Sequence, residues 1–391
     1  MNTEEKDAAY IAHTYSRYPV CFVKGKGSHL IDEEGKDYID MGSGIGVDIF
    51  GVADEKWMDA VTSQLHVLNH VSNLFYTKPM AGLAEMLCQK TGMKKVFFSN
   101  SGAEANECAI KGARKYSIDK YGKERNEIIT LINGFHGRTI TTLAATGQDI
   151  FHKDFFPFTP GFLYTPANEL PSFIKLCEEH PQVCAVMVEP IQGEGGVHPL
   201  SKEFFEGVGQ YAKDHDILLI VDEVQTGNGR TGKLYGYMNY DVEPDIVSTA
   251  KGIGGGLPLG VTMFNEKTEN VYTPGTHGST FGGNPIACAG ALSIMARIDD
   301  ALLKEVTAKG QYIKDEFTGA KGVKSVAGMG LMWGIEPDKD VKEIVPRLLA
   351  KGVVVLTAKE KIRLLPALNI PWTDLKKAVS LMKDVLAESI I

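Results

Sequence analysis

The middle of the chain alternates short apolar runs with helical patterns, and this alternation limits the possible folds more than any other feature. Strand-length apolar runs occur within residues 94–100, 127–132, 183–190 and 216–223, and amphipathic segments separate them. Such runs, without regular polar alternation, are typical of strands buried on both faces of a helix-covered parallel sheet. The sequence therefore predicts an α/β fold with a mixed, mostly parallel sheet.

The two ends of the chain differ from the middle. Residues 22–41 read as hairpin strands with turn residues between them, and the C-terminal part alternates helices and strands over a more charged background. A chain of 391 residues is long enough for more than one domain. We predict an N-terminal segment over 1–50 that belongs to a small domain, a large domain over 51–285, and a small C-terminal domain over 286–391.

Charge and composition restrict the classes of partner. The net charge of −8 argues against a general affinity for nucleic acid or anionic membranes, which leaves small molecules as the expected ligands. The acidic start MNTEEKDAAY does not resemble a signal peptide and no run is long enough to span a bilayer, so we expect a cytoplasmic protein. The six cysteines form no CxxC pair, and we expect neither a disulfide framework nor a metal site.

Polar motifs follow several of the predicted strands. They are SNSGAE, GFHGRT, EPIQGEGG, DEVQTG and TAKGIGGG. Sheets of this class bind ligands outside the carboxyl ends of their strands. The sequence therefore predicts one ligand site to which all of these motifs contribute.

Lys251 and Asp222 are the most informative pair among these motifs. Lys251 stands between an apolar run and a glycine cluster, and Asp222 ends the run ILLIVD. A carboxylate at the end of a buried strand needs a cation or several hydrogen bonds, and a pyridinium nitrogen is one such cation. Chemistry on pyridoxal phosphate requires a Schiff-base lysine and an acid opposite the ring nitrogen. Taken alone, Lys251 reads as a solvated loop lysine and Asp222 equally well as a helix cap; together they favour a pyridoxal-phosphate enzyme.

The turn around Ser101 and Gly102 is a candidate phosphate site. It leads from a strand into a helix, where free N–H groups and the positive end of the helix dipole attract a phosphate. Ser101 and Glu104 also fit a capping box, which needs no ligand. The sequence leaves both interpretations open.

Two further motifs supply candidate binding groups. In GFHGRT, Phe135 could cover one face of a planar cofactor and Arg138 could hold a substrate carboxylate. GNGRTG at 227–232 fits the glycine pattern of dinucleotide-binding proteins, but no long amphipathic helix follows it. A nucleotide-binding oxidoreductase is therefore the less favoured alternative from a different class.

The chain resembles the class III aminotransferases of the pyridoxal-phosphate fold type I superfamily. The resemblance covers nearly the whole chain and rests on an ordered set of motifs: FFSNSGAEANECAIKGARKY, GFHGRT, VMVEPIQGEGGV, LLIVDEVQTGNGRTG, the Lys251 segment, HGSTFGGNPIACA and IRLLPALNI. It implies a large domain with a mostly parallel, seven-stranded sheet between helices. It also implies a small α/β domain formed by both termini, and ping-pong transamination.

The same resemblance implies roles in cofactor binding. Lys251 would bind the cofactor aldehyde, and Asp222 would pair with the pyridinium nitrogen. Thr280 would reach the phosphate from the neighbouring subunit, so the functional unit would be a homodimer with active sites at the subunit interface. The other implied cofactor contacts are Ser101, Gly102, Ala103, Phe135, Val224 and Gln225.

The resemblance also implies how substrates are held. Arg138 would bind the distal carboxylate, and Arg363 would bind the α-carboxylate of glutamate. Glu194 would pair with Arg363 and release it when glutamate binds. Ser279 would contact the substrate from the partner chain, and Tyr15 would lie near the pocket.

Within the family the sequence is most similar to the enzymes that act on N-acetylornithine in arginine biosynthesis. The implied reaction converts N2-acetyl-L-ornithine and 2-oxoglutarate into N-acetyl-L-glutamate 5-semialdehyde and L-glutamate. Succinylornithine, ornithine, 4-aminobutyrate and acyl-lysine stay open as alternative amine donors, because small differences in the pocket lining decide among them.

Overall fold

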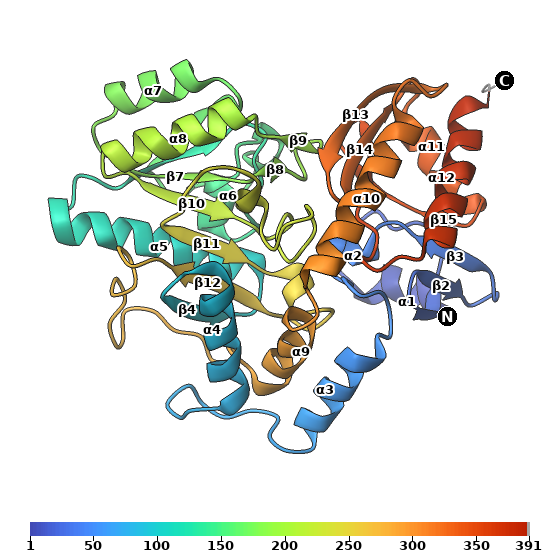
Figure 1. Ribbon diagram of the computed structural model, residues 1–391, viewed down its shortest axis with the longest axis horizontal. Helices are drawn as coiled ribbons and strands as arrows, with labels where there is room; N and C mark the ends of the chain where they lie inside the picture. The colour runs from blue at the N-terminus through green and yellow to red at the C-terminus, as the bar shows by residue number, and fades with distance from the viewer. Residues whose placement is uncertain (389–391) are drawn as a thin grey trace.

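The centre of the computed structural model, which describes residues 1–388, is a seven-stranded sheet with helices on both faces (Figure 1). Neighbouring strands run parallel except at β12, which is antiparallel to both β11 and β4. The predicted mostly parallel α/β sheet is confirmed. In spatial order the strands are β4 (Lys95–Ser99), β12 (Gly260–Phe264), β11 (Ile246–Thr249), β10 (Leu218–Asp222), β7 (Val183–Val188), β5 (Glu127–Leu131) and β6 (Phe162–Thr165).

Both faces of this sheet are buried, which explains the continuous apolar runs. In β10, Leu218 and Ile220 belong to the core on the α5 side, whereas Leu219 and Val221 belong to the core on the opposite side. A polar side chain is therefore tolerated only where the strand ends, at Asp222. The flanking helices are α4 (Lys78–Thr91), α5 (Gly102–Tyr121), α6 (Ile140–Ala145), α7 (Leu170–Glu179) and α8 (Lys202–Asp214).

Segments from both ends of the sequence lie together beside the large sheet (Figure 1). One sheet joins β1 (Phe22–Lys26), β2 (His29–Asp32) and β3 (Asp37–Asp40) to β15 (Val353–Val354). A second, antiparallel sheet contains β13 (Val323–Met329), β14 (Met332–Pro337), β17 (Lys361–Leu364) and β16 (Leu356–Ala358). Helices α10 (Asp300–Phe317), α11 (Val341–Ala350) and α12 (Trp372–Ala387) pack against these strands and share a separate apolar core with them. The residue boundaries of the domains stay a prediction.

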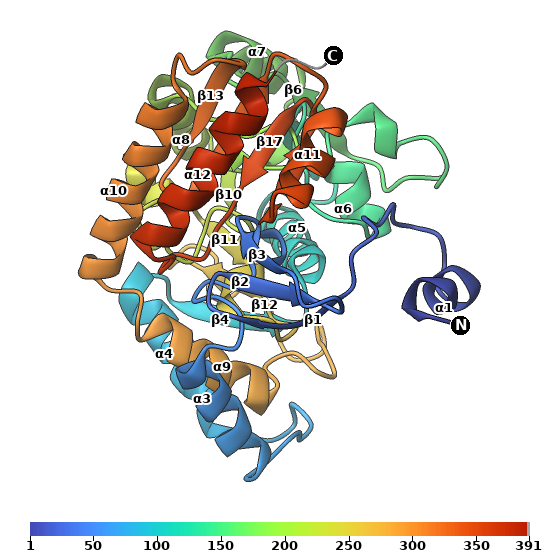
Figure 2. The same cartoon turned by 90° about the vertical axis from the view of Figure 1, so that its right-hand side faces the viewer.

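The remaining elements are short or peripheral. Helix α1 (Thr3–Tyr10) has no buried residue and stands away from the rest of the chain (Figure 2). None of the described helices is long and apolar enough to cross a membrane. The other elements are α2 (Ser43–Gly46), α3 (Glu55–Leu65), α9 (Pro285–Met295), the short pair β8 (Ile191–Gln192) and β9 (His198–Pro199), and the 3-10 turns η1 (Asp149–Phe151), η2 (Gly236–Asn239) and η3 (Lys251–Ile253).

The GNGRTG loop has a structural role that depends on its arginine, Arg230. Arg230 in this loop is fully buried, and its Nη1 donates hydrogen bonds to the carbonyl oxygens of Leu331, at 3.1 Å, and Pro366. The Leu331 amide in turn donates to the Arg230 carbonyl at 2.9 Å. Burial lowers the pKa of Arg230 to about 9. The loop thus joins the large sheet to the C-terminal region, and it leads into η2 instead of a long helix.

Replacing Arg230 with Met tests this link. The change leaves two buried carbonyl groups without their donor, and each such loss costs about 1–3 kcal/mol, partly offset because a buried charge is removed. We expect the thermal midpoint of the Arg230→Met protein to fall by about 1–5 °C, measured by calorimetry at one scan rate. Lys233→Met, an exposed change three positions away, is the matched control. Equal midpoints for the two variants would contradict a structural role for Arg230.

Candidate active site

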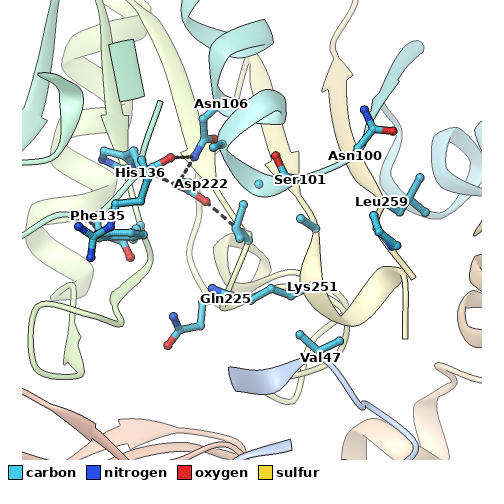
Figure 3. Close-up of a pocket in the computed structure, with 18 of the residues that line it drawn as sticks. Val47, Asn100, Ser101, Asn106, Phe135, His136, Asp222, Gln225, Lys251 and Leu259 are labelled. Carbon is cyan, nitrogen blue, oxygen red and sulfur yellow. Dashed lines mark hydrogen bonds and ion pairs between the residues drawn. The ribbon is translucent and has the colours of Figure 1, made fainter. Parts of the chain in front are cut away.

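A cavity of about 600 Å³ opens at the carboxyl ends of β4, β5, β10 and β11 (Figure 3). The motifs that follow these strands line it, as the sequence predicted. Of the predicted site residues, those that line the cavity are Tyr15, Ser101, Gly102, Ala103, Phe135, Arg138, Asp222, Val224, Gln225 and Lys251.

Asp222 is a buried carboxylate held by donors from several elements (Figure 3). Its Oδ2 accepts hydrogen bonds from Asn106 Nδ2 at 2.7 Å and from His136 Nδ1 at 2.8 Å. Its Oδ1 accepts from the Val224 amide at 3.0 Å. Asn106 is fixed in turn, because its Oδ1 accepts a hydrogen bond from Ser248 Oγ at 2.5 Å. These contacts fix the carboxylate and hold it toward the cavity.

Lys251 follows β11, the strand next to β10, and lines the same cavity. Its backbone has φ 48°, a left-handed conformation that is uncommon for a residue with a side chain. A Cβ on the next residue, Gly252, would lie 2.1 Å from Ile49 Cδ1, so a larger residue there would require the buried Ile49 side chain to shift. Burial lowers the pKa of Lys251. The amine therefore loses its proton more readily than an exposed lysine, as a nucleophile requires.

The turn before α5 offers an anion site. Ser101 is the N-cap of this 20-residue helix, and its Oγ accepts a hydrogen bond from the Glu104 amide at 3.2 Å. The predicted cap is therefore present, while the amides of Gly102 and Ala103 make no hydrogen bond within residues 1–388 and stay available to a phosphate. A Cβ on Gly102 would lie 2.7 Å from Val224 Cγ1. Glycine is thus needed for the close approach of these two cavity walls.

An arginine, a glutamate and a glutamine form a polar cluster beside the cavity. Arg363 Nη1 donates to Glu194 Oε1 at 2.6 Å and to Gln225 Oε1 at 3.0 Å. Gln225 Nε2 donates to Glu194 Oε1 at 3.4 Å. Burial raises the pKa of Glu194, but the charge and hydrogen bond of Arg363 outweigh burial and lower it overall. Arg363 and Glu194 are not among the residues that line the cavity, and Gln225 connects them to it.

Arg138 differs from Arg363 because no acidic residue neutralises it. Among residues 1–388 it makes no ion pair and no side-chain hydrogen bond. Its guanidinium carbon lies 4.2 Å from the ring centre of Phe151 and 5.7 Å from that of Phe135. The cavity therefore has one available arginine, Arg138, in its wall, and the paired arginine, Arg363, lies beside it.

Ser279 and Thr280 lie outside the cavity of their own chain. Ser279 Oγ accepts a hydrogen bond from Asn100 Nδ2 at 3.2 Å, and Asn100 lines the cavity. Thr280 is exposed, and Tyr15 is an exposed residue at the edge of the cavity. The roles expected of Ser279 and Thr280 from a partner chain stay predictions.

Sequence reasoning missed three buried polar residues of the site: Asn106, His136 and Glu189. Burial alone would lower the pKa of His136, but its hydrogen bond to Asp222 and the charge of Asp222 raise it overall. Glu189 accepts from the Phe135 amide at 2.9 Å and the Gly193 amide at 3.2 Å, and burial raises its pKa to about 7. His136 and Glu189 stand inside motifs that had been singled out, so a search for titratable residues there would have found them. Asn106 gives no such signal.

Known proteins that resemble this chain share one activity class. Residues 10–386 match the family described as "Aminotransferase class-III". An acetylornithine aminotransferase of Haemophilus ducreyi is 48% identical over 387 residues, which cover 98% of each chain. The N-acetylornithine aminotransferase of Stenotrophomonas maltophilia has a similar structure, with a TM-score of 0.84, 31% identity and coverage of 98% of each chain.

The fold is shared with a second branch of the family. An ornithine aminotransferase of Toxoplasma gondii superposes with a TM-score of 0.94 and 30% identity, over 99% of this chain and 95% of that one. Full-length similarity in both sequence and structure excludes the alternative of a nucleotide-binding oxidoreductase. The chain therefore belongs to the class III aminotransferase family.

Proposed function

We propose that this aminotransferase moves the terminal amino group of N-acetylornithine to 2-oxoglutarate, with pyridoxal phosphate as cofactor. The observation that carries the proposal is one cavity lined by Asp222 and Lys251, with the Arg363–Glu194 pair beside it. The relatives of Haemophilus ducreyi and Stenotrophomonas maltophilia, named for acetylornithine, support the choice of donor. A cytoplasmic location stays a prediction.

The residues of the cavity suit pyridoxal phosphate in shape and charge. The Asp222 carboxylate would face the ring nitrogen, and the Gly102 and Ala103 amides would hold the phosphate. Phe135 and Val224 would cover the two faces of the ring. When bound, the cofactor supplies an aldehyde for the amine and a protonated ring that withdraws electrons from the reacting carbon.

Lys251 is the proposed proton carrier. A protonated amine cannot add to an aldehyde. The lowered pKa of Lys251 favours the neutral amine, which would bind the cofactor aldehyde. With the cofactor and a substrate amine bound, Lys251 Nζ would be placed to take the proton from the substrate carbon that bears the amine and to carry it to the cofactor. The hydrogen bonds from His136 and Asn106 would hold the Asp222 carboxylate opposite the ring nitrogen.

Two substrates with different charges must use the same cavity. N-acetylornithine reacts at its terminal amine, so its only carboxylate lies far from the reacting carbon and suits Arg138. Glutamate has a second carboxylate beside the reacting carbon, which suits Arg363. Glu194 neutralises Arg363 while the first substrate is bound, and it must give way to the glutamate carboxylate.

The proposed homodimer would complete the site with Thr280 of the second copy. Exposed apolar side chains of residues 65–76 lie next to the loop that carries Thr280. Asn73 Nδ2 ties this segment to the loop, because it donates hydrogen bonds to the carbonyl oxygens of Ser279 at 3.0 Å and Gly282 at 2.8 Å. The exposed apolar residues of this segment and the loop are Leu65, Val67, Leu68, Leu74, Phe75, Tyr76 and Phe281. An apolar patch of this kind, beside a residue without a site of its own, supports association through this face.

Lys251→Ala tests the chemistry. The purified wild-type protein should show visible absorption from the bound cofactor, and the variant should lose the covalent form and its spectrum. We expect the half-reaction with glutamate to slow by about 10²–10⁴-fold or more, because proton transfer loses its carrier. Lys202→Ala, an exposed lysine on α8, is the control. A colourless wild-type protein that binds no pyridoxal phosphate would overturn the proposal.

Glu194→Gln tests the pairing with Arg363. In the variant, glutamate no longer competes with the Glu194 carboxylate for Arg363. When N-acetylornithine is bound, by contrast, the charge of Arg363 has no carboxylate partner. We expect the ratio of kcat/KM for glutamate to kcat/KM for N-acetylornithine to rise by about tenfold, the effect of ~1.4 kcal/mol. Glu360→Gln, an exposed change near β17, is the control. Equal effects on both half-reactions would remove the switch from the mechanism.

Tyr76→Glu tests the dimer. A charge placed in the exposed apolar patch should shift the protein from dimer to monomer in sedimentation velocity, because burying an unpaired carboxylate at an interface is unfavourable. The monomer should also bind pyridoxal phosphate more weakly, since Thr280 of the second copy is missing. Phe155→Glu changes an exposed aromatic residue elsewhere and serves as the control. A monomeric wild-type enzyme with full activity would contradict the proposed assembly.

A further inference from the structure

The backbone around Arg138 is fixed, whereas its guanidinium makes no polar contact with any residue from 1 to 388. Gly137 has φ 140°, and a Cβ there would lie 2.5 Å from Thr142 Oγ1, which leaves no room for a larger residue. The Thr139 amide donates to Thr142 Oγ1 at 3.1 Å, and Thr139 Oγ1 donates to Glu107 at 2.5 Å. The backbone on both sides of Arg138 is therefore fixed. Its long side chain keeps its rotatable bonds, and ordering them costs free energy when a substrate binds.

Two aromatic rings restrict this side chain. Phe135 and Phe151 lie edge to face, with ring centres 5.9 Å apart and an interplanar angle of 69°. The Arg138 guanidinium lies near both ring centres and is closer to that of Phe151, at 4.2 Å. A cation near an aromatic face is attracted by the ring electrons, and the attraction leaves all guanidinium N–H groups available. Phe151 can thus orient Arg138 without using the donors that a carboxylate needs.

Phe151 is itself anchored to the cavity wall. It ends η1, and its amide donates to the Gln148 carbonyl at 3.0 Å. Gln148 Nε2 donates to the carbonyl of Gly134, the residue before Phe135, at 3.1 Å. The two rings therefore belong to segments that are tied together. Phe151 does not line the cavity, so its influence on a substrate passes through Arg138.

We propose that Phe151 is a positioning residue that presents the Arg138 guanidinium to the distal carboxylate and so sets the preference for dicarboxylate acceptors. This proposal deepens the proposed function and relies on its assignment of Arg138. Phe151 makes no contact with the reacting carbon. Its loss should therefore weaken the binding of 2-oxoglutarate and leave the proton transfer steps unchanged.

The test compares Phe151→Leu with Phe151→Tyr in the holoenzyme. Leucine keeps an apolar side chain without an aromatic face, whereas tyrosine keeps the face. For Phe151→Leu we expect KM for 2-oxoglutarate to rise by about 3–10-fold, with kcat changed less than about twofold. For 2-oxopentanoate, which has a methyl group where 2-oxoglutarate has its distal carboxylate, kcat/KM should stay unchanged. Phe151→Tyr should keep the wild-type KM for 2-oxoglutarate. Phe155→Leu, on the exposed loop that follows, should leave both KM and kcat unchanged.

A double-mutant cycle separates this role from a merely structural one. If Phe151 acts through Arg138, Phe151→Leu should have no further effect on KM in the Arg138→Gln background. Equal losses with 2-oxoglutarate and 2-oxopentanoate, or additive effects in the double variant, would overturn the proposal. The acceptor half-reaction does not involve the donor. A wild-type enzyme that refuses N-acetylornithine but accepts 2-oxoglutarate would therefore overturn the donor assignment alone.

Discussion

The buried carboxylate of Asp222 is the group around which the cavity is organised. A charge at the end of a strand covered on both faces is unfavourable unless donors surround it. These donors are Asn106 on α5, His136 after β5 and the Val224 amide after β10, so three segments must meet at one point. The segments that supply these donors also form walls of the cavity. Phe135 precedes His136, Gly102 begins the helix that carries Asn106, and both residues line the cavity. A group that water stabilises in solution, and that needs hydrogen-bond donors once buried, thus serves as a structural centre in the fold.

In the proposed function, the two arginines would recognise different substrate carboxylates. Arg363 is buried and paired with Glu194, so its charge is available only when a competing carboxylate displaces its partner. Arg138 is exposed and lies among aromatic rings, so its donors are available at all times. A carboxylate site that is always available and one that is available only on displacement of Glu194 would together let one cavity accept molecules with one or two carboxylates.

Residues that follow the ends of predicted strands could be assigned to the site from the sequence. Residues that reach the site only through the packing of helices and loops could not. Lys251 and Asp222 were predicted to meet because parallel strands end at one edge of the sheet, and both line the cavity. Asn106 was not predicted, because its role depends on which face of α5 points to Asp222. Phe151 was not predicted either, since only the fold of the segment after α6 brings it to Arg138. The antiparallel direction of β12 likewise leaves no mark in its apolar run.

The pairing of β3 with β15 has a consequence for how the chain is made. All strands of the large sheet lie between residues 95 and 264, so that sheet can assemble from one continuous stretch. The sheet of β1, β2 and β3 is incomplete until Val353 and Val354 of β15 are present, and a ribosome adds these residues near the end of synthesis. Until then one edge of β3 has unpaired backbone groups, a state that invites association with other chains. We therefore expect the nascent protein to be most vulnerable to aggregation after its large sheet has been synthesised and before its last strands appear.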